Sequence, residues 1–577
     1  MNEVLLIKVY ETLYPLRGII FLDFVNAYTL HNLWIAISTV LFSYLSFLAG
    51  GLLLRIMRVD ASTGPKRFVY RIFLGYGIFG IFGLLLGLAG LFNAFFLRLF
   101  AIIVILASFG TIAAHVRVFA GHVISPLSAL ASFKRGIFGK HRALKFITVL
   151  WLFVNFFIVF VPVTGWDALN YHLPIIANLI EEGRLTFTPA IQYYQRYPVF
   201  AEIIYAVPMV IFGNTFAPGT PSAFPPEMPL GERVGIFNAG AAPFVFQLLQ
   251  YGMLLLLLVL IYDFLKQRVE NKFLLYAVPI FILAISDLQR EVMHGGYVDI
   301  FVFGFGLAGL FLVLENILAE KINFTELYIA AVLFGMALAM KYTTLLILAI
   351  AGLLLVTALF RAGAGVKAAV RHLSAYAAII SLIAGFWYAK NFIWFGNPVY
   401  PIFSDSEFAR IVGWFIVERT PVNFFLFPFY VFGQWFVNPD ETSSRLIVLG
   451  YFILVYALLV FLLAWRRTLT VLEACLLFFI EMYLLFSFIF SHQIRFMLPA
   501  LVLLVIFLVL LADRLYTLIK LRFGERLYYI LGRISYAGLV ALSLALLLGY
   551  IHYFRVRFNY ITGNYTEAEY IADIGWQ

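Results

Sequence analysis

The sequence places a carboxylate and an imidazole five residues apart in the segment GWDALNYHLP, as Asp167 and His172. Asp167 follows an apolar run, so we expect it at a membrane–water interface. Partial loss of water there would raise the basicity of the carboxylate and suit it to accept a proton. An ordinary helix-capping aspartate is the alternative. His172 would supply a hydrogen bond or a weak metal contact, or would pack as a plain interfacial histidine.

A second acidic group, Asp299, follows the sequence HGGYV, with Glu291 and His294 just before it. Asp299 either completes a two-carboxylate site with Asp167 or is a helix-start carboxylate favoured by the helix dipole. A divalent cation such as Mg²⁺ or Mn²⁺ accepts oxygen and imidazole ligands of this kind. The residues for such a site are Asp167, Glu291, His294 and Asp299, although no ligand spacing enforces it.

Three cations, Lys341, Lys390 and Arg495, stand at the ends of separate apolar segments. They can neutralise a phosphate or diphosphate, and arginine can do so with two parallel hydrogen bonds. The alternative for each is a side chain that reaches up to lipid phosphates. Arg196 adds a cation among aromatic residues, a combination found around sugars and isoprenyl phosphates. The tyrosines expected in this substrate loop are Tyr171, Tyr193, Tyr194 and Tyr197.

The composition indicates the class of structure in which these residues lie. Of 577 residues, 63% are hydrophobic and only 12% are charged, and the mean hydropathy is +0.97. Charge this sparse excludes a cytosolic enzyme and a disordered chain, and the single cysteine, Cys475, excludes a disulfide framework. We predict an all-α polytopic membrane bundle of about 14 spans. They lie near 29–54, 69–92, 95–117, 143–163, 233–264, 273–290, 298–319, 325–340, 343–361, 373–394, 445–464, 469–490, 496–514 and 533–555.

The distribution of charge sets the orientation. With alternate loops taken as cytoplasmic, 25 of the 40 Lys and Arg residues lie inside, as the positive-inside rule requires. The net charge of +10 is therefore a topology signal, and nucleic-acid binding is excluded. Both chain ends and the long loops 164–232 and 395–444 are expected outside, with residues 1–28 as an external segment. Three helices are expected at the outer interface, over 168–180, 198–213 and 421–436, and the last two either lie along it or dip into it.

The chain divides into a three-span accessory region, 1–142, and a catalytic region, 143–577, that holds the external loops. Two GxGxxG matches, at Gly75–Gly80 and Gly304–Gly309, lie inside predicted spans. There they indicate close helix packing rather than a dinucleotide site. Nothing resembles a P-loop, a Ser/His/Asp arrangement or a cysteine nucleophile, so ATP-driven transport is not expected from this chain alone.

Several segments carry a resemblance that covers about residues 143–577. They are WDALNYHLP, RYPVFAEIIYAVPMVIFGN, GERVGIFNAG, GMALAMKYTTLL, WYAKNFIWFGNPVYPIF and HQIRFMLPAL. In this order and topology they resemble the GT-C membrane glycosyltransferases. The nearest branch is the bacterial one akin to protein O-mannosyltransferases and the lipid A aminoarabinose transferase (family 39-like). Two departures are that Ala168, not a second acid, follows Asp167, and that three additional spans precede the loop.

The resemblance implies a GT-C-like fold and an inverting hexosyl- or pentosyltransferase. It would move a sugar from a polyprenyl-phosphate donor to a lipid, glycan or protein acceptor. The active site would face outside on a bacterial or archaeal cell membrane. By position, Asp167 matches the family's general base, and Lys341, Lys390 and Arg495 match cations near the donor phosphate.

Three other functions fit the same residues. A transporter or flippase of polyprenyl-linked glycans would use the same cations, but it needs polar residues along a path. Glu481 is the one acidic residue that we place deep in a span. A glycan ligase or polymerase would use a diphosphate-linked donor instead. The third alternative is a purely structural membrane subunit.

Overall fold

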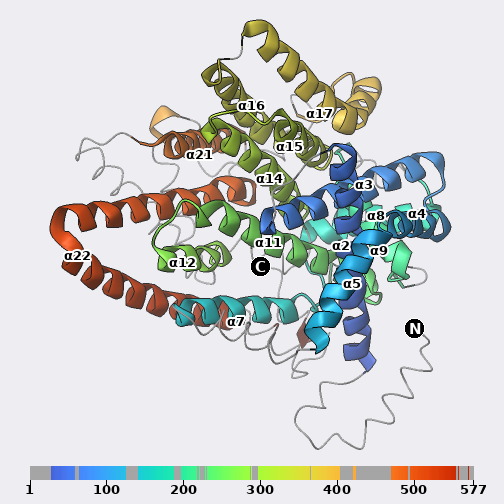
Figure 1. Cartoon of the computed structure of the whole chain (residues 1–577). Helices are drawn as coiled ribbons and strands as arrows, with labels where there is room; N and C mark the ends of the chain where they lie inside the picture. The colour runs from blue at the N-terminus through green and yellow to red at the C-terminus, as the bar shows by residue number, and fades with distance from the viewer. Residues whose placement is uncertain are drawn as a thin grey trace, which may run out of the picture.

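The computed structural model describes residues 27–58, 64–124, 141–186, 196–217, 220, 228, 230–285, 288, 297–363, 365–402, 420–423, 469–490, 494–553, 557, 569 and 570. In these residues every regular element is a helix, which confirms the all-α prediction. Figure 1 shows their arrangement. The first helices are α2 (Ala27–Ile56), α3 (Pro65–Ala89), α4 (Ala94–Ala107), α5 (Phe109–Ile124), α7 (Arg142–Ile158), the π-helical turn η2 (Ala168–His172), α8 (Leu173–Glu182), α9 (Phe200–Phe212) and α10 (Leu230–Asn238). They are followed by α11 (Ala242–Lys266), α12 (Lys272–Leu283), α14 (Asp299–Leu318), α15 (Phe324–Leu338), α16 (Thr344–Arg361), α17 (Val366–Phe395), α21 (Val471–Phe490), the 3₁₀ turn η4 (Ile494–Met497) and α22 (Leu498–Tyr553).

The described residues contain eight helices that are long and apolar enough to cross a membrane, or nine if the bent pair α4 and α5 forms one span. This is the architecture of a multi-pass membrane protein, but it does not confirm the predicted count of 14. Predicted span 445–464 lies outside the described residues. At other predicted spans the helix is short: α12 has 12 residues and contains Pro279, and α15 has 15 residues.

Helix α22 joins two predicted spans, 496–514 and 533–555, into one 56-residue element. Gly524 interrupts the helix, with φ 83° and ψ 171°. These angles lie outside the helical range, and glycine adopts them readily because it has no Cβ. Figure 1 shows the two arms folding back from this bend, with the second arm beside α7. At roughly 1.5 Å per residue each arm is long enough to cross a bilayer.

The glycine-rich helix α3 lies in close contact with its neighbours. A Cβ added at Gly75 would meet the carbonyl oxygen of Ser46 in α2 at 1.8 Å, so the two backbones nearly touch. At Gly80 an added Cβ would meet Phe200 and Ile204 of α9 at 2.7 Å. The glycines therefore serve helix packing, as expected from their place in a span. The division at residue 142 stays a prediction, since α3 packs on the first long loop of the second region.

Helices α8 and α9 are buried in the fold. Every residue from Phe200 to Ile211 in α9 is buried, as is every residue from Leu173 to Leu179 in α8. The expectation that 168–180 and 198–213 lie at the outer interface stays a prediction, and the structure adds that protein covers both helices. Helix α9 is apolar around nearly its whole circumference, which is why it is covered on all sides. Of the third expected helix, 421–436, only residues 421–423 are described.

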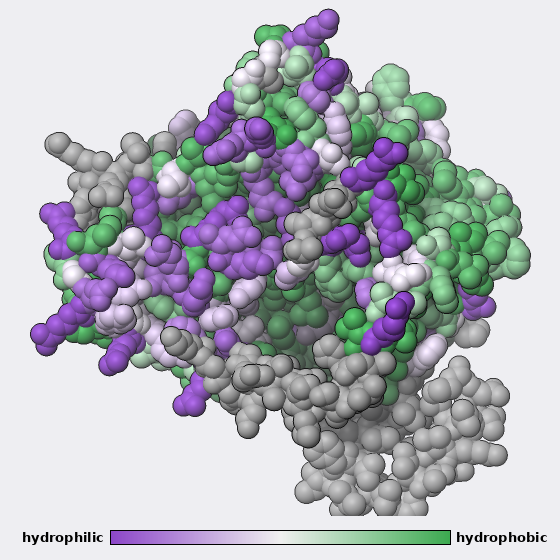
Figure 2. Space-filling view, viewed as in Figure 1, coloured by the Kyte–Doolittle hydropathy of each residue, from purple (hydrophilic) through white to green (hydrophobic). Residues whose placement is uncertain are grey.

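An apolar surface lies on the outside of α4. Large side chains there are strongly exposed, among them Phe95 at 68%, Leu106 at 67% and, at the start of α5, Phe109 at 69%. Figure 2 shows hydrophobic residues gathered on the side of the molecule where Figure 1 places α4. A continuous apolar surface of this kind suits contact with lipid.

The contact between α2 and α3 gives a first prediction. We expect Gly75→Ala to lower stability by about 1–3 kcal/mol, the usual cost of overpacking, because its Cβ would overlap the Ser46 carbonyl oxygen. Thermal unfolding of the purified protein in detergent measures the effect. The matched control is Gly352→Ala in α16, where an added Cβ meets nothing within 4 Å. Equal melting temperatures for the two variants would show that the helices do not approach as closely as described.

Candidate functional site

A π-helical turn positions the first three polar side chains of the site. Asp167 precedes η2, and the N–H of Leu173 donates to the carbonyl oxygen of Ala168, five residues back. This wider turn brings residues four and five positions after Asp167 toward it. Pro174 supplies a local reason, because its ring cannot donate a hydrogen bond to the fourth carbonyl back and would clash with it in a regular α-helix.

Asp167 is bound by two donors at one oxygen. Arg495 Nη1 lies 2.6 Å from Asp167 Oδ2, and the Tyr171 hydroxyl donates to the same oxygen at 2.7 Å. Among the described residues no donor reaches the second oxygen, Oδ1. Asp167 is 6% exposed. One carboxylate oxygen is thus held in place by the protein while the other keeps its hydrogen-bonding capacity.

Opposing effects set the pKa of Asp167. Burial by itself raises the pKa of this carboxyl, but the positive charges of Arg495, of His172 when it is protonated and of Lys341 outweigh burial and leave the pKa below its ordinary value. Asp167 is therefore ionised at neutral pH. The expectation of raised basicity is wrong for the protein without substrate, because sequence reasoning did not see that a cation pairs with this carboxylate. Burial and the charge of Asp167 raise the pKa of Tyr171, which keeps its proton and remains a donor.

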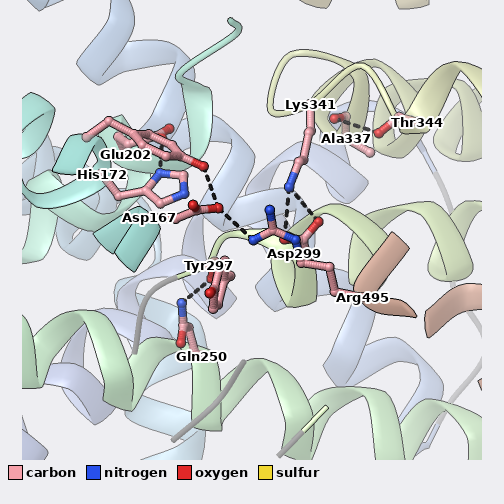
Figure 3. Close-up of polar contacts among 11 residues, drawn as sticks. Asp167, His172, Glu202, Gln250, Tyr297, Asp299, Ala337, Lys341, Thr344 and Arg495 are labelled. Atoms are coloured by element: carbon pink, nitrogen blue, oxygen red, sulfur yellow. Dashed lines mark hydrogen bonds and ion pairs between the residues drawn. The ribbon is translucent and has the colours of Figure 1, made fainter. Parts of the chain in front are cut away.

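A second ion pair lies beside the first. Lys341 Nζ, in the connection between α15 and α16, lies 2.7 and 2.9 Å from the two carboxylate oxygens of Asp299 at the start of α14. The ring of Phe496 joins the pairs, since Lys341 Nζ and the Arg495 guanidinium lie 4.9 and 5.1 Å from its centroid. We call Asp167, Asp299, Lys341 and Arg495 the carboxylate–cation cluster. Figure 3 shows these four side chains together.

The aromatic ring of Tyr297 supports the arginine. The Arg495 guanidinium lies 4.5 Å from the ring centroid, a favourable cation–π geometry. Gln250 of α11 donates to the backbone oxygen of Tyr297, which fixes this segment just before α14.

His172 points to a different partner. Its Nδ1 lies 2.5 Å from Oε1 of Glu202 in α9, and the two residues are 3% and 2% exposed. The imidazole ring also packs on Tyr171, with ring centroids 4.1 Å apart. His172 thus connects the segment that carries Asp167 to the buried helix α9.

The two lysine-bearing segments meet in a polar network. The hydroxyl of Tyr342, the residue after Lys341, donates to the backbone oxygens of Arg196 and Tyr400 at 3.1 and 3.2 Å. Asn391, the residue after Lys390, donates to the Tyr342 hydroxyl and, at 2.7 Å, to the backbone oxygen of Arg196. We call Arg196, Tyr342, Asn391 and Tyr400 the tyrosine–asparagine network.

Side chains of the remaining expected residues lie around this network. The Arg196 guanidinium lies 5.2 Å from the ring centroid of Tyr400, and the rings of Tyr197 and Tyr342 are 5.8 Å apart. Lys390 is 6% exposed, with its Nζ 5.4 Å from the ring of Trp387 and 5.5 Å from that of Trp394.

The structure therefore brings together Asp167, Asp299, Lys341, Arg495 and Tyr171. His172 binds Glu202, while Arg196, Tyr197 and Lys390 lie in or beside the tyrosine–asparagine network. The predicted residues Glu291, His294, Tyr193 and Tyr194 lie outside the described residues. Across the described ranges no group of three or more His, Cys, Asp or Glu residues is arranged to hold a metal ion. Asp167 and Asp299 are instead paired with cations, and we assign no metal ligand.

Sequence reasoning missed Glu202, Tyr297, Phe496 and Asn391. For Glu202 a signal was present, because it is a lone acid in the apolar segment FAEIIYAVPMVIF. An ionisable residue in such a segment marks a functional or partnered position. The others have no comparable signal, since their roles depend on contacts between distant parts of the chain.

No family model, curated protein or solved structure matches the chain.

The ion pair between Asp167 and Arg495 gives a second prediction. Removing one partner leaves the other without its counter-charge in a site largely removed from water. We therefore expect Asp167→Asn and Arg495→Gln each to destabilise the fold, and the double variant to destabilise it by less than the sum of the two single effects. The expected coupling is about 1–3 kcal/mol. Because the fold lowers the pKa of Asp167, this coupling is complete above the ordinary pKa and disappears as the pH falls through the lowered one.

Thermal unfolding of the four proteins measures the coupling. The control cycle uses Lys520 and Glu525, whose side chains are 48% and 67% exposed and 3.5 Å apart. An exposed pair of this kind couples by less than about 1 kcal/mol. Additive effects at Asp167 and Arg495 would contradict the ion pair.

Proposed function

We propose that the protein is an integral-membrane glycosyltransferase that moves a sugar from a polyprenyl-phosphate donor to an acceptor at the outer face of the membrane. The observation that carries the proposal is the 2.6 Å contact between Asp167 and Arg495, which are 328 residues apart in sequence. The contact joins a carboxylate and a cation, and the reaction needs both kinds of group: one to accept a proton and one to stabilise a phosphate. The resemblance of segments in 143–577 to GT-C enzymes supports the same activity.

The chemistry follows from these groups. The acceptor hydroxyl oxygen attacks the anomeric carbon of the sugar, and the bond from that carbon to the phosphate oxygen breaks with inversion. Asp167 takes the hydroxyl proton as general base. Polyprenyl phosphate leaves with an additional negative charge, which Lys341 and Arg495 stabilise. A nucleotide is not consumed in this scheme.

In the protein without substrate both cations are already paired with carboxylates. A donor phosphate must therefore compete with Asp167 for Arg495 and with Asp299 for Lys341. When Arg495 turns to the phosphate, Asp167 loses the largest of the charges that lower its pKa, and its pKa rises. Donor binding would thus make Asp167 a stronger base at the moment when an acceptor proton has to be removed.

Basic residues at the other end of the bundle support the orientation. Lys66 binds Glu315 near the end of α14, whereas Asp299 lies at its start. Lys266 at the end of α11 and Arg514, paired with Glu473 at the start of α21, belong to the same end as Lys66. By the positive-inside rule this end is cytoplasmic, which puts the carboxylate–cation cluster outside. We propose a bacterial or archaeal cell membrane as the location.

A third prediction tests the general base. We expect Asp167→Asn to reduce sugar transfer by about 10²–10⁴-fold, the usual contribution of a general base, while the folded protein still binds polyprenyl phosphate. The assay presents purified protein in proteoliposomes with a series of polyprenyl-phosphate hexoses and pentoses carrying a radioactive sugar. The matched control is Asp263→Asn, which removes a carboxylate paired with Lys266 at the opposite end of the bundle. Full activity of Asp167→Asn would refute the assignment.

A fourth prediction concerns the donor phosphate. We expect Lys341→Gln and Arg495→Gln each to weaken polyprenyl-phosphate binding by about 10- to 100-fold, the value of a charge-assisted hydrogen bond of 1.5–3 kcal/mol. Lys520→Gln at the bend of α22 is the control and should bind as the unaltered protein does. Binding of radioactive polyprenyl phosphate and of the uncharged polyprenol gives the comparison. Equal affinity for phosphate and alcohol would exclude the cations as a phosphate site.

A further inference from the structure

The buried pair His172–Glu202 has no part in the reaction as described so far. It links η2 to α9 through the 2.5 Å contact between Nδ1 and Oε1. Both side chains are almost completely removed from water, at 4% and 3% exposure. Two ionisable groups in such surroundings are costly unless their charges and hydrogen bonds are satisfied.

The pair is incompletely satisfied. His172 Nε2 and Glu202 Oε2 are both buried, and neither has a hydrogen-bond partner among the residues that the structure describes. A charged N–H left without an acceptor costs more than a lone pair left without a donor. We therefore assign the proton to Nδ1, which donates to the Glu202 carboxylate, and leave Nε2 as an unprotonated base.

The free nitrogen lies near the proposed general base. Figure 3 shows the imidazole of His172 between the Glu202 and Asp167 carboxylates. The charge that His172 carries when it is protonated is one of the causes that lower the pKa of Asp167, as expected for close neighbours. No hydrogen bond joins them in this structure, so proton transfer between them requires a movement of a side chain.

Among the residues that the structure describes, few other titratable groups surround the pair. Asp167 and Tyr171 belong to the same segment as His172, and Tyr205 stands one turn after Glu202 in α9. Phe246 of α11 packs near both helices, with ring centroids 6.5 Å from His172 and 4.3 Å from Tyr205. From the turn η4 the charged group on Asp167 is Arg495, and Lys341 adds a second positive charge that acts on the same carboxylate. The pair thus responds mainly to the charge state of Asp167.

We infer, resting on the proposed glycosyl transfer, that His172 and Glu202 form a buried proton-holding pair that receives from Asp167 the proton taken from the acceptor hydroxyl. The acceptor O–H bond breaks as its oxygen bonds to the anomeric carbon, and the proton passes to Asp167. Asp167 then gives it to His172 Nε2, and the Glu202 carboxylate neutralises the imidazolium. When polyprenyl phosphate leaves, the proton returns through Asp167 to solvent, so each group recovers its original state.

The pair has a defined consequence for Asp167. Once Asp167 has passed on its proton, it is again an anion and can pair with Arg495, which then releases the product phosphate. His172 and Glu202 are positioning residues in this scheme, since they act through Asp167 and do not contact substrate.

The first experiment needs no substrate. The full-length protein in lipid nanodiscs, with ¹⁵N-labelled histidine, is titrated by NMR, and His172→Gln identifies the His172 signals. We expect the half-protonation pH of His172 to fall by about one pH unit or more in Glu202→Gln, because a neighbouring negative charge is lost. In Asp167→Asn we expect a fall in the same direction, and in the control Asp263→Asn no change. An unchanged His172 titration in Asp167→Asn overturns the inference.

The second experiment uses the transfer reaction. In this scheme His172 takes a proton from Asp167 only when its Nε2 is unprotonated. The reaction rate should therefore fall at low pH over the same range in which His172 becomes protonated. In Glu202→Gln we expect a lower rate and an acid limb shifted to lower pH by the amount measured by NMR, with unchanged polyprenyl-phosphate affinity. Glu202→Asp should restore part of the rate. If the acid limb of Glu202→Gln lies at the same pH as that of the unaltered protein, Glu202 has only a structural role and the inference is overturned.

The two experiments separate the two proposals. If the unaltered protein binds no polyprenyl phosphate and transfers no sugar, the proposed function fails. The NMR titration still decides whether the charges of Glu202 and Asp167 affect the protonation of His172. If transfer occurs but the titration and the pH profile show no coupling, the function stands and the proton-holding pair is wrong.

Discussion

The ion pair between Asp167 and Arg495 is the contact on which this end of the bundle depends. Both side chains lie among apolar helices, where an ionised group without a counter-charge is strongly unfavourable. The pair therefore fixes the segment after α7 against the start of α22, although these segments are far apart in sequence. Lys341 and Asp299 apply the same constraint to α14 and the α15–α16 connection. Polar contacts thus hold the helix ends together where apolar packing stops.

These contacts form two layers around Asp167. On one side are the cations, which are the groups able to receive an anionic substrate. On the other side is the buried pair of His172 and Glu202, which is shielded by α9 and by the helices packed on it. Tyr171 connects the layers, because it donates to Asp167 and its ring packs on His172. Asp167 thereby lies between the cations that can receive an anionic substrate and the pair that we propose to hold a proton.

The sequence predicted the helical class and much of the polar cluster for the same reason. Charged residues are rare in an apolar chain, so Asp167, Asp299, Lys341 and Arg495 are conspicuous without any knowledge of the fold. Their pairing was not predictable, because it depends on which helix ends meet in space. The number of spans also could not be read from hydropathy, since an apolar stretch such as that of α9 can be covered by protein as well as by lipid. Glu202 was overlooked because its segment was assigned to the interface.

The π turn at Ala168–His172 makes the spacing of this site sensitive to chain length. A wide turn of this kind holds one residue more than a regular helical turn would. Deleting one residue there would leave a continuous α-helix, but it would rotate everything after the deletion by roughly 100° relative to Asp167. Tyr171 and His172 could then not both face the carboxylate while α8 kept its buried side. The segment therefore tolerates changes of side chain far better than changes of register, and insertions or deletions should be confined to the loops on either side of it.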